Sequence, residues 1–272
     1  MYPEISVILC SYNSEKFIYE TLLSIKEQTY KNYEIVIVDD GSKDKTVLLI
    51  NNFIQENKNI NIKFLKQQNK GLAKARNVAI ANCSFNLVAI IDHDDLWHKD
   101  KLSTQIQFII RNDKCYLFFS DFEYLNYNNK YKTRFQIAEF IDNYIPQELN
   151  LKKQRGYYYL AKFGCFIGSS TVIFKKEVMH EIGKFDEEYI FLTDYIFFLK
   201  LAKKFDIFCS PEVLAKWRFH NENATVKLNS HYIKEMNKLY IIFIKDNTFN
   251  LKSKFNFFYK YLKINIKSFF KI

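Results

Sequence analysis

Apolar and amphipathic stretches alternate along the first hundred residues, and this alternation constrains the fold more than any other feature of the chain. Four β-branched, apolar segments are typical of buried strands. They are residues 5–10, 34–38, 62–65 and 87–91. A helical pattern follows each of the first three, beginning near residues 13, 44 and 72. A strand–helix order repeated in this way predicts an α/β fold, a mostly parallel sheet with helices on both faces.

Polar residues stand at the ends of three of these predicted strands. Residues 11–13 (Ser-Tyr-Asn) follow the first strand, 39–42 (Asp-Asp-Gly-Ser) the second and 92–95 (Asp-His-Asp-Asp) the fourth. In open α/β sheets, ligands bind beyond the carboxyl ends of the strands. We therefore expect these groups to meet at one edge of the sheet. The fold alone gives no reason for such a polar cluster, so the pattern indicates a binding site.

The strongest of these groups is the acidic one, with three carboxylates in residues 92–95. Crowded like charges repel one another, and a hard divalent cation relieves the repulsion. Both Mg²⁺ and Mn²⁺ accept carboxylate and diphosphate oxygens together. The group therefore predicts a site for Mn²⁺ or Mg²⁺ at Asp92 and Asp94. The alternative is an acidic turn whose aspartates only cap the next helix.

A basic segment opens the helix predicted from residue 72. Lys70 precedes Gly71, and Lys74 and Arg76 follow on the first turns. A helix N-terminus favours anions, and an arginine can fork onto a phosphate. The segment therefore predicts contact with phosphate, although a solvated basic face is the alternative. Neither G-x-G-x-x-G after the first strand nor G-x-x-x-x-G-K-[ST] occurs, which argues against the common dinucleotide and P-loop sites.

Together these motifs resemble the family 2 glycosyltransferases of the GT-A fold. The similarity is close over residues 5–46, 69–77 and 90–102, and looser over 168–203 and 216–225. The resemblance implies a nucleotide-binding, Rossmann-like sheet. It also implies an inverting transfer of a hexose or hexosamine from a nucleotide-sugar, a UDP-sugar in the first instance, to a hydroxyl of a glycan acceptor. Such enzymes serve cell-surface polysaccharide, lipopolysaccharide or capsule synthesis.

The resemblance also assigns roles on the donor side. Tyr12 would stack on the donor base, Asp40 would hydrogen-bond it, and Arg76 would complete the nucleotide pocket. Asp92 would contact the ribose or a metal-bound water, and Asp94 would ligate the metal between the donor phosphates. The residues expected to bind the nucleotide-sugar are Ser11, Tyr12, Asn13, Asp40, Lys70, Arg76, Asp92, His93, Asp94 and Arg218.

On the acceptor side, the family places its catalytic base in a Glu-Asp pair after a G-x-F-D-E stretch. Here residues 183–187 (Gly-Lys-Phe-Asp-Glu) are followed by Thr193 and Asp194. Asp194 matches the base that would take the proton of the acceptor hydroxyl, and Thr193 replaces the usual glutamate. The alternative for Asp194 is a helix N-cap. Arg218 and His220 match an Arg-x-His element that can reach the diphosphate and the metal, so Asp92, Asp94 and His220 are the expected metal ligands.

Beyond residue 115 the pattern weakens. It predicts a hairpin near residues 128–129, an irregular aromatic stretch over 135–165, a strand over 168–174, a helix over 175–182 and another from Thr193. We divide the chain into a glycosyltransferase domain at 1–225 and a basic, aromatic, helical tail at 226–272. Within the domain, we expect 1–115 to bind the nucleotide-sugar and 116–225 to form the acceptor side.

The tail carries most of the net charge. Residues 226–272 hold ten lysines against two acids, Glu235 and Asp246, which gives +8 of the total +10. On a helix over 251–272, five lysines fall in an arc of about 100°, and most apolar residues fall outside it. The five are Lys252, Lys260, Lys263, Lys267 and Lys271. This pattern suits a helix lying on an anionic membrane, near a lipid-linked glycan acceptor. The alternative is that the apolar face packs on the domain or on a second subunit of a homodimer.

The compartment and the rival functions follow from what the sequence lacks. It shows no signal-peptide pattern and no apolar run near the roughly 18 residues of a membrane span, so we expect a cytoplasmic protein, peripheral on the inner face of the cytoplasmic membrane.

One rival is a nucleotidyltransferase that makes a nucleotide-sugar, but those enzymes carry a Gly-rich loop where this chain has residues 10–13. The other is a basic nucleic-acid-binding module; residues 92–95 would repel its phosphates, so we expect no nucleic-acid partner.

Overall fold

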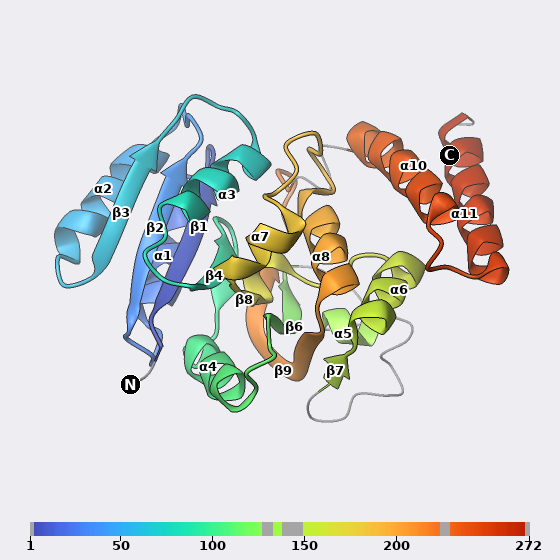
Figure 1. Ribbon diagram of the computed structural model, residues 1–272. Coiled ribbons are helices and arrows are strands. Elements are labelled where there is room, and N and C mark those ends of the chain that lie inside the picture. The colour runs from blue at the N-terminus through green and yellow to red at the C-terminus, as the bar shows by residue number, and fades with distance from the viewer. Residues whose placement is uncertain (1–2, 127–132, 138–148, 224–228, 270–272) are drawn as a thin grey trace.

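The computed structural model describes residues 3–126, 133–137, 149–223 and 229–269. Its first part is a parallel sheet of four strands in the order β3-β2-β1-β4 (Figure 1). The strands are β1 (Ile5–Ser11), β2 (Tyr33–Asp39), β3 (Asn61–Lys66) and β4 (Leu87–Asp92). The helices between them are α1 (Ile18–Lys26), α2 (Thr46–Glu56) and α3 (Leu72–Ala81). The predicted α/β alternation is confirmed.

Beyond β4 the sheet continues with strands of mixed direction, in the order β8, β6, β9 and β5, while β7 pairs with β9. Their bounds are β5 (Leu96–Trp97), β6 (Leu117–Leu125), β7 (Leu149–Leu151), β8 (Ile173–Lys175) and β9 (Ile207–Arg218). β6 and β9 run parallel to each other, and β8 is antiparallel to both β4 and β6. The sheet is therefore parallel over β3, β2, β1 and β4 and mixed beyond β4.

The predictions for the acceptor half were less accurate. The described part of the stretch over 135–165 is not irregular, because α5 (Arg134–Ile137), β7 and α6 (Lys153–Phe163) lie in it. α6 packs closely on the sheet at Gly156, where an added Cβ would lie 3.2 Å from the Ile207 side chain. Its three tyrosines and its glycine give it a weak helical pattern in the sequence.

Two further predictions in this half need correction and one is confirmed. The strand predicted over 168–174 begins only at Ile173, because the 3₁₀ helix η1 (Ser169–Thr171) precedes it. The helix predicted over 175–182 is a 3₁₀ turn, η2 (Lys176–Val178), followed by α7 (Met179–Ile182). The helix predicted from Thr193 is α8 (Thr193–Lys204). The predicted hairpin near residues 128–129 lies outside the described residues.

Helices cover both faces of the sheet, as its alternating side chains require. Ile8 and Cys10 of β1 point into a core formed with α3, α6 and α8. Val7 and Leu9 of the same strand point into a second core, formed with α1, α2 and α4 (Lys101–Arg111). Because both faces of the sheet are buried, the ends of its strands are left open to ligands. We therefore expect the site at the carboxyl ends of the strands.

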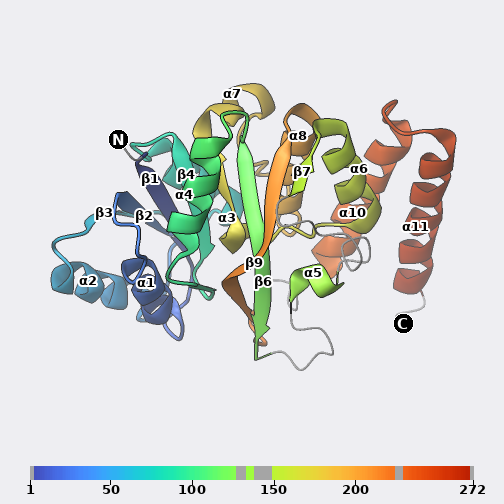
Figure 2. The same cartoon turned by 90° about the horizontal axis from the view of Figure 1, so that it is seen from below.

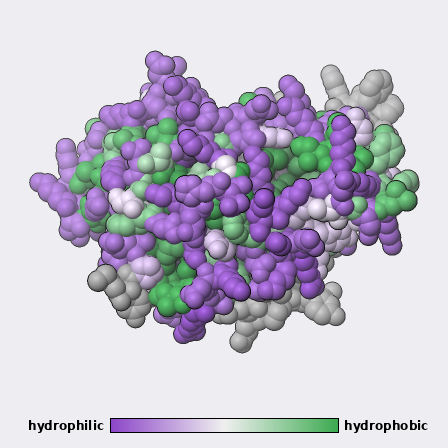
Figure 3. All heavy atoms as spheres, viewed as in Figure 1, coloured by the Kyte–Doolittle hydropathy of each residue, from purple (hydrophilic) through white to green (hydrophobic). Residues whose placement is uncertain are grey.

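The tail forms two helices at the end of the molecule away from β3 (Figures 1 and 2). α10 (Asn229–Lys245) packs on the acceptor half, and α11 (Leu251–Phe269) packs on α10. Hydrophobic side chains also gather on the outside, at the right edge of the view over α11 (Figure 3). Within the described residues, every helix is too short or too polar to cross a membrane.

Candidate active site

The strands β1, β2 and β4 lie side by side, and their polar carboxyl ends lie together. In the parallel register, Ser11 of β1 lies beside Asp39 of β2, and Cys10 lies beside Asp92 of β4. The prediction that these groups meet in space is confirmed. The three strands end at the same level of the sheet, and the turns that follow them form the candidate site.

The turn after β1 exposes Tyr12 and engages its neighbours internally. Ser11 donates from Oγ to Asp39 Oδ1 at 3.2 Å. Asn13, with a φ of +49°, accepts from the backbone N–H of Lys43 at 2.8 Å and donates its own backbone N–H to Ser42 Oγ at 2.9 Å. Tyr12 remains 42% exposed, so its ring is the part of this turn open to a planar ligand.

Asp40 organises the start of α3. Its Oδ1 accepts from the backbone N–H of Lys70 at 2.8 Å and from Gln67 Nε2 at 2.6 Å, and its Oδ2 accepts from the backbone N–H of Gly71 at 2.8 Å. A carboxylate has about four acceptor positions, and these contacts use most of them. The side chain of Lys70 stays exposed at the same turn. Asp40 therefore fixes the loop beside the expected site of the nucleotide base.

Arg76 joins the donor side of the site to the acceptor side. Its side chain is 1% exposed and lies over the Phe185 ring, 5.5 Å from the centroid. Nη2 donates to Asp92 Oδ1 at 2.7 Å, and Nη1 donates to Asp194 Oδ1. A fork of this kind suits two carboxylates. Two predicted site residues that lie 102 positions apart are thus held by one cation.

Asp94 and His220 form a candidate metal position. His220 Nε2 lies 2.9 Å from Asp94 Oδ2, and Asn223 Nδ2 lies 3.3 Å from the same oxygen. Two ligands at right angles around an ion about 2.1 Å away would be about 3 Å apart. The pair therefore fits two neighbouring positions of an octahedral ion, with other positions left for phosphate oxygens and water.

The expected third ligand is not part of this pair. Asp92 is paired with Arg76, and within the described residues no three acidic, histidine or cysteine side chains are grouped as a metal site. A divalent ion at Asp94 and His220 would need the donor diphosphate to complete its shell. Mg²⁺ is often bound in this way, through one or two carboxylates and the phosphates of the substrate.

Arg218 and Asp95 support the acidic turn from behind. Arg218 donates from Nε to the Asp94 carbonyl oxygen at 2.9 Å, from Nη2 to Glu20 Oε2 at 2.5 Å, and from its backbone N–H to Asp95 Oδ1 at 3.1 Å. Asp95 is buried, and Ser170 Oγ donates to it at 2.6 Å. Burial, followed by the charges of Asp94 and Asp92, raises the pKa of Asp95 well above its ordinary value. Asp95 is thus a structural member of the group.

Several contributors were missed by the sequence reasoning. Glu20 holds Arg218, Asn223 holds Asp94, and Ser170 accepts the backbone N–H of Asp92 at 3.0 Å. Asn223 stands three residues after His220, and Ser170 stands in the Gly-Ser-Ser-Thr stretch, so both had a positional signal. Glu20 had none, because it is an ordinary acid on an amphipathic helix. The structure gives the predicted His93 a contact through its carbonyl oxygen, which accepts from Thr21 Oγ1 at 3.0 Å.

Asp194 lies in the first turn of α8, facing Arg76, with its side chain 24% exposed. Thr193 beside it is buried and donates from Oγ1 to the Tyr189 carbonyl oxygen at 2.8 Å. Thr193 therefore links the preceding loop to the start of α8, and it brings no charge to the site. The carboxylate that stays open at this helix start is that of Asp194.

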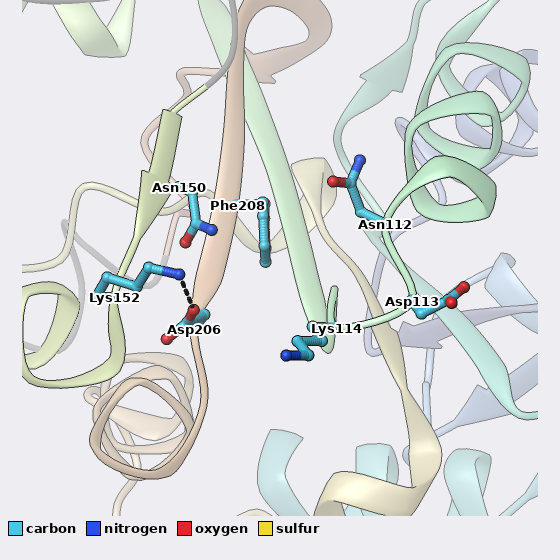
Figure 4. A pocket seen from close by; sticks show the side chains of 7 residues that line it. All are labelled: Asn112, Asp113, Lys114, Asn150, Lys152, Asp206 and Phe208. Carbon is cyan, nitrogen blue, oxygen red and sulfur yellow. Dashed lines mark hydrogen bonds and ion pairs between the residues drawn. The ribbon is translucent and has the colours of Figure 1, made fainter.

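A cavity of about 330 Å³ lies elsewhere, at the starts of β6 and β9 (Figure 4). It is lined by Asn112, Asp113, Lys114, Asn150, Lys152, Asp206 and Phe208. Lys152 and Asp206 in its wall are already paired at 2.9 Å. Because β6 and β9 are parallel and end near Arg218, this cavity is at the opposite edge of the sheet. None of the predicted site residues lines it, so the chemistry places the site at the strand ends.

Comparison with known proteins shows the family to which the chain belongs. Residues 6–183 match the family model of glycosyl transferase family 2. An uncharacterized glycosyltransferase of Rickettsia bellii is 27% identical over 91% of this chain, which spans only 34% of that protein. The UDP-Glc:alpha-D-GlcNAc-diphosphoundecaprenol beta-1,3-glucosyltransferase WfgD of Escherichia coli is 27% identical over 97% of this chain and 94% of its own.

Two solved structures share the fold. Residues 1–349 of Staphylococcus aureus TarS, in complex with UDP-GlcNAc, superpose with a TM-score of 0.69 at 22% identity, covering 97% of this chain and 73% of that one. The mannosyltransferase PcManGT of Pyrobaculum calidifontis, in complex with GDP-Man and Mn²⁺, gives a TM-score of 0.67 at 16% identity, covering 98% and 70%. At these identities the likeness concerns the fold alone.

Proposed function

The chain belongs to glycosyl transferase family 2 and has the GT-A fold, and from this premise we propose that it transfers a sugar from a UDP-sugar to a hydroxyl of a lipid-linked glycan. The observation that carries the proposal is the bridge through Arg76. The Arg76 guanidinium binds both Asp92, at the end of β4, and Asp194, in the first turn of α8. In the proposed reaction, Asp92 would lie on the phosphate side of the site and Asp194 on the proton-accepting side, and Arg76 joins the two. We also propose that residues 1–115 bind the donor and 116–225 the acceptor.

The donor side would hold the nucleotide diphosphate. The exposed Tyr12 ring offers a stacking surface for the base, and Asp40 and the start of α3 border the same edge. Asp94 and His220 would hold Mn²⁺ or Mg²⁺, which when bound stabilises negative charge on the departing diphosphate. Arg218 keeps the acidic turn in place, and the exposed Lys70 adds positive charge beside the phosphates.

On the acceptor side, Asp194 would accept the proton of the acceptor hydroxyl. The hydroxyl oxygen forms a bond to the anomeric carbon as the bond from that carbon to the diphosphate oxygen breaks. The nucleoside diphosphate leaves, and configuration at the carbon is inverted in one displacement. The donor of WfgD is named as UDP-Glc and its acceptor as a GlcNAc-diphosphoundecaprenol. These two molecules are therefore the first substrates to test.

The test measures transfer with a panel of UDP-glucose, UDP-GlcNAc and GDP-mannose, with a GlcNAc-diphospholipid acceptor and Mn²⁺. We expect a UDP-sugar to be used, and Asp194→Asn to lower transfer by roughly 10²–10⁴-fold while UDP still binds. Asp186→Asn is the matched control, because Asp186 lies on the same loop but pairs with Lys200 at 3.1 Å. Near-normal transfer by Asp194→Asn would remove it as the base, and failure to bind any nucleotide-sugar would overturn the proposed function.

The tail supports a second element of the proposal, peripheral contact with an anionic membrane at the cytoplasmic face. α11 has two apolar faces. Phe257 is buried against α10, whereas a second group remains exposed and forms the outer face of the helix. This outer face consists of Leu251 (84% exposed), Phe255 (70%), Phe258 (46%), Tyr259 (59%) and Leu262 (41%).

Charge favours a lipid surface as the occupant of the outer face. At about 100° per residue its members span an arc of about 100°. Lys252 and Lys263 stand on one flank and Lys254 on the other. Each lysine near an anionic surface contributes about 1 kcal/mol, and the apolar arc would enter the headgroup boundary.

Flotation with vesicles tests this contact. We expect binding to vesicles that contain phosphatidylglycerol, weaker binding at high salt, and little binding to pure phosphatidylcholine. Phe255→Ser with Phe258→Ser should abolish binding, whereas Ile241→Ser with Ile242→Ser, an exposed apolar pair on α10, should not. A concentration-dependent dimer that the first double variant dissociates, with no vesicle binding, would assign the outer face to a second subunit.

A further inference from the structure

The tail contains a buried acid whose position the transfer reaction does not by itself explain. Glu235 of α10 is 4% exposed. It is one of two acids in a segment that holds ten lysines. A buried carboxylate is costly unless hydrogen bonds satisfy it, so its partners show what it does.

Its partners are three successive backbone amides of the loop before α8. Oε1 accepts from the N–H of Ile190 at 2.8 Å, and Oε2 accepts from the N–H of Phe191 at 3.1 Å and of Leu192 at 2.8 Å. Successive amides that converge on one anion form a nest. The positive end of the α8 dipole begins at the next residue and adds to the attraction. Glu235 therefore fixes the three residues that lead into Thr193 and Asp194.

The same loop is held from the opposite side by α3. Asn77 donates from Nδ2 to the Phe185 carbonyl oxygen at 2.9 Å and accepts from the Phe185 N–H at 2.9 Å. Arg76, one residue earlier on α3, binds Asp194. The segment from Phe185 to Asp194 is thus clamped between a helix of the donor half and a helix of the tail. Removing either clamp would leave the other to hold the segment alone.

We propose that Glu235 is a positioning residue for sugar transfer, because it fixes the start of α8 and thereby the direction of Asp194. The proposal rests on the role proposed above for Asp194. The turn at the start of α8 carries the uncharged Thr193 beside Asp194, and the carboxylate of Glu235 reaches this turn from α10. The tail is then a part of the catalytic machinery, separately from any contact with lipid.

The expected effect falls on turnover and spares donor binding. A misplacement of a reacting group by about 1 Å costs about 10²-fold in rate, so Glu235→Ala should lower kcat by roughly 10–100-fold. In the described part of the chain, the amides of residues 190–192 bond to Glu235 and to none of the expected donor-binding residues. The Kd for UDP and the KM for the donor should therefore stay within about twofold. Glu235→Gln should also lose kcat, because its NH₂ would face an amide N–H that needs an acceptor.

The experiment uses the full chain and two readouts. The first is kcat and KM for transfer, with UDP binding by calorimetry. The second is hydrogen–deuterium exchange of the amides at residues 190–192, which does not depend on activity. The control is Asn237→Ala, which removes the Asn237–Asn265 bonds of 2.9 Å that join α10 to α11 and leaves the nest intact. We expect faster exchange and reduced kcat in Glu235→Ala and neither in Asn237→Ala.

The outcomes separate this inference from the proposed function. Unchanged exchange at 190–192, or a normal kcat in Glu235→Ala, would overturn the positioning role. A parallel loss of UDP binding and kcat would also overturn it, because it would indicate a general structural defect. If the unmodified protein transfers no sugar while exchange responds as expected, the clamp is correct and the function assigned to the site is wrong.

Discussion

Replacing Arg76 with glutamine removes the cation that separates Asp92 from Asp194. The guanidinium is 1% exposed and donates to both carboxylates. Without it, two negative groups would face each other across a partly enclosed site. Glutamine keeps the first three carbons of the side chain and one amide donor, but it lacks both the charge and the reach of the guanidinium fork.

The magnitude follows from the burial of each partner. Removing one member of a fully buried ion pair costs about 3–5 kcal/mol, because the remaining charge is left uncompensated. Here the carboxylates keep part of their contact with water, with side-chain exposures of 31% for Asp92 and 24% for Asp194. We therefore expect the lower end of that range, about 3 kcal/mol of lost unfolding free energy. Neutralising Asp194 in the same chain should return part of it.

The assay is urea denaturation at pH 7 of the wild type, Arg76→Gln, Asp194→Asn and the double variant. Contacting charges show coupling of about 0.5–3 kcal/mol in such a cycle, and we expect the double variant to be more stable than Arg76→Gln alone. Arg76→Lys is the charge control and should lie between wild type and Arg76→Gln, because an ammonium lacks the fork. A loss below about 0.5 kcal/mol for Arg76→Gln, the usual range of a neutral surface change, would refute the bridge.

Two further predictions concern the metal and the pH. Asp94→Asn should lower turnover by several orders of magnitude and weaken Mn²⁺ binding measured by electron paramagnetic resonance, while full activity after dialysis against EDTA would remove the metal from the proposal. Burial favours the neutral form of Asp246, but bonds from Lys203, Thr248 and Tyr157 outweigh it and hold its pKa below the ordinary 3.8. A depressed carboxyl pKa stabilises the fold above that ordinary value and loses the effect as the pH falls below it. Asp246→Asn should therefore cost about 1.5–3 kcal/mol at pH 7 in urea denaturation, and a gap from wild type that does not narrow below pH 3.8 would contradict this assignment.

The donor half could be predicted from the sequence because its signals are local. The β-branched runs at residues 5–10 and 87–91 identify buried strands, and a repeated strand–helix order leaves few topologies. The placement of Asp92 beside Cys10 follows from strands that end together. Such inferences need only periodicity and the rule that parallel strands share an edge.

The acceptor half could not be predicted as well, because long-range contacts decide it. β6 and β9 pair in parallel although the end of β6 at Leu125 and the start of β9 at Ile207 are 82 positions apart. The start of β6 shows no apolar–polar alternation, because Phe118 and Phe119 are buried in the cores on opposite faces of the sheet. Likewise, the motif around Arg76 suggested a phosphate ligand, but only the fold shows Asp194 within reach of its guanidinium.

The tail shows why net charge alone misleads about such a segment. Its +8 predicted a basic appendage, but both of its acids face the acceptor half. Glu235 binds the loop before α8, and Asp246 accepts from Tyr157 at 2.8 Å and from Lys203 at 2.6 Å. These two contacts attach α10 by both ends, because Glu235 lies in its first half and Asp246 directly follows its last residue. α11 packs on this part of the molecule through Phe257, and its exposed apolar arc with the flanking lysines stays on the outside, where the proposed lipid surface would lie. The two acids of the segment therefore dock it, although its lysines outnumber them.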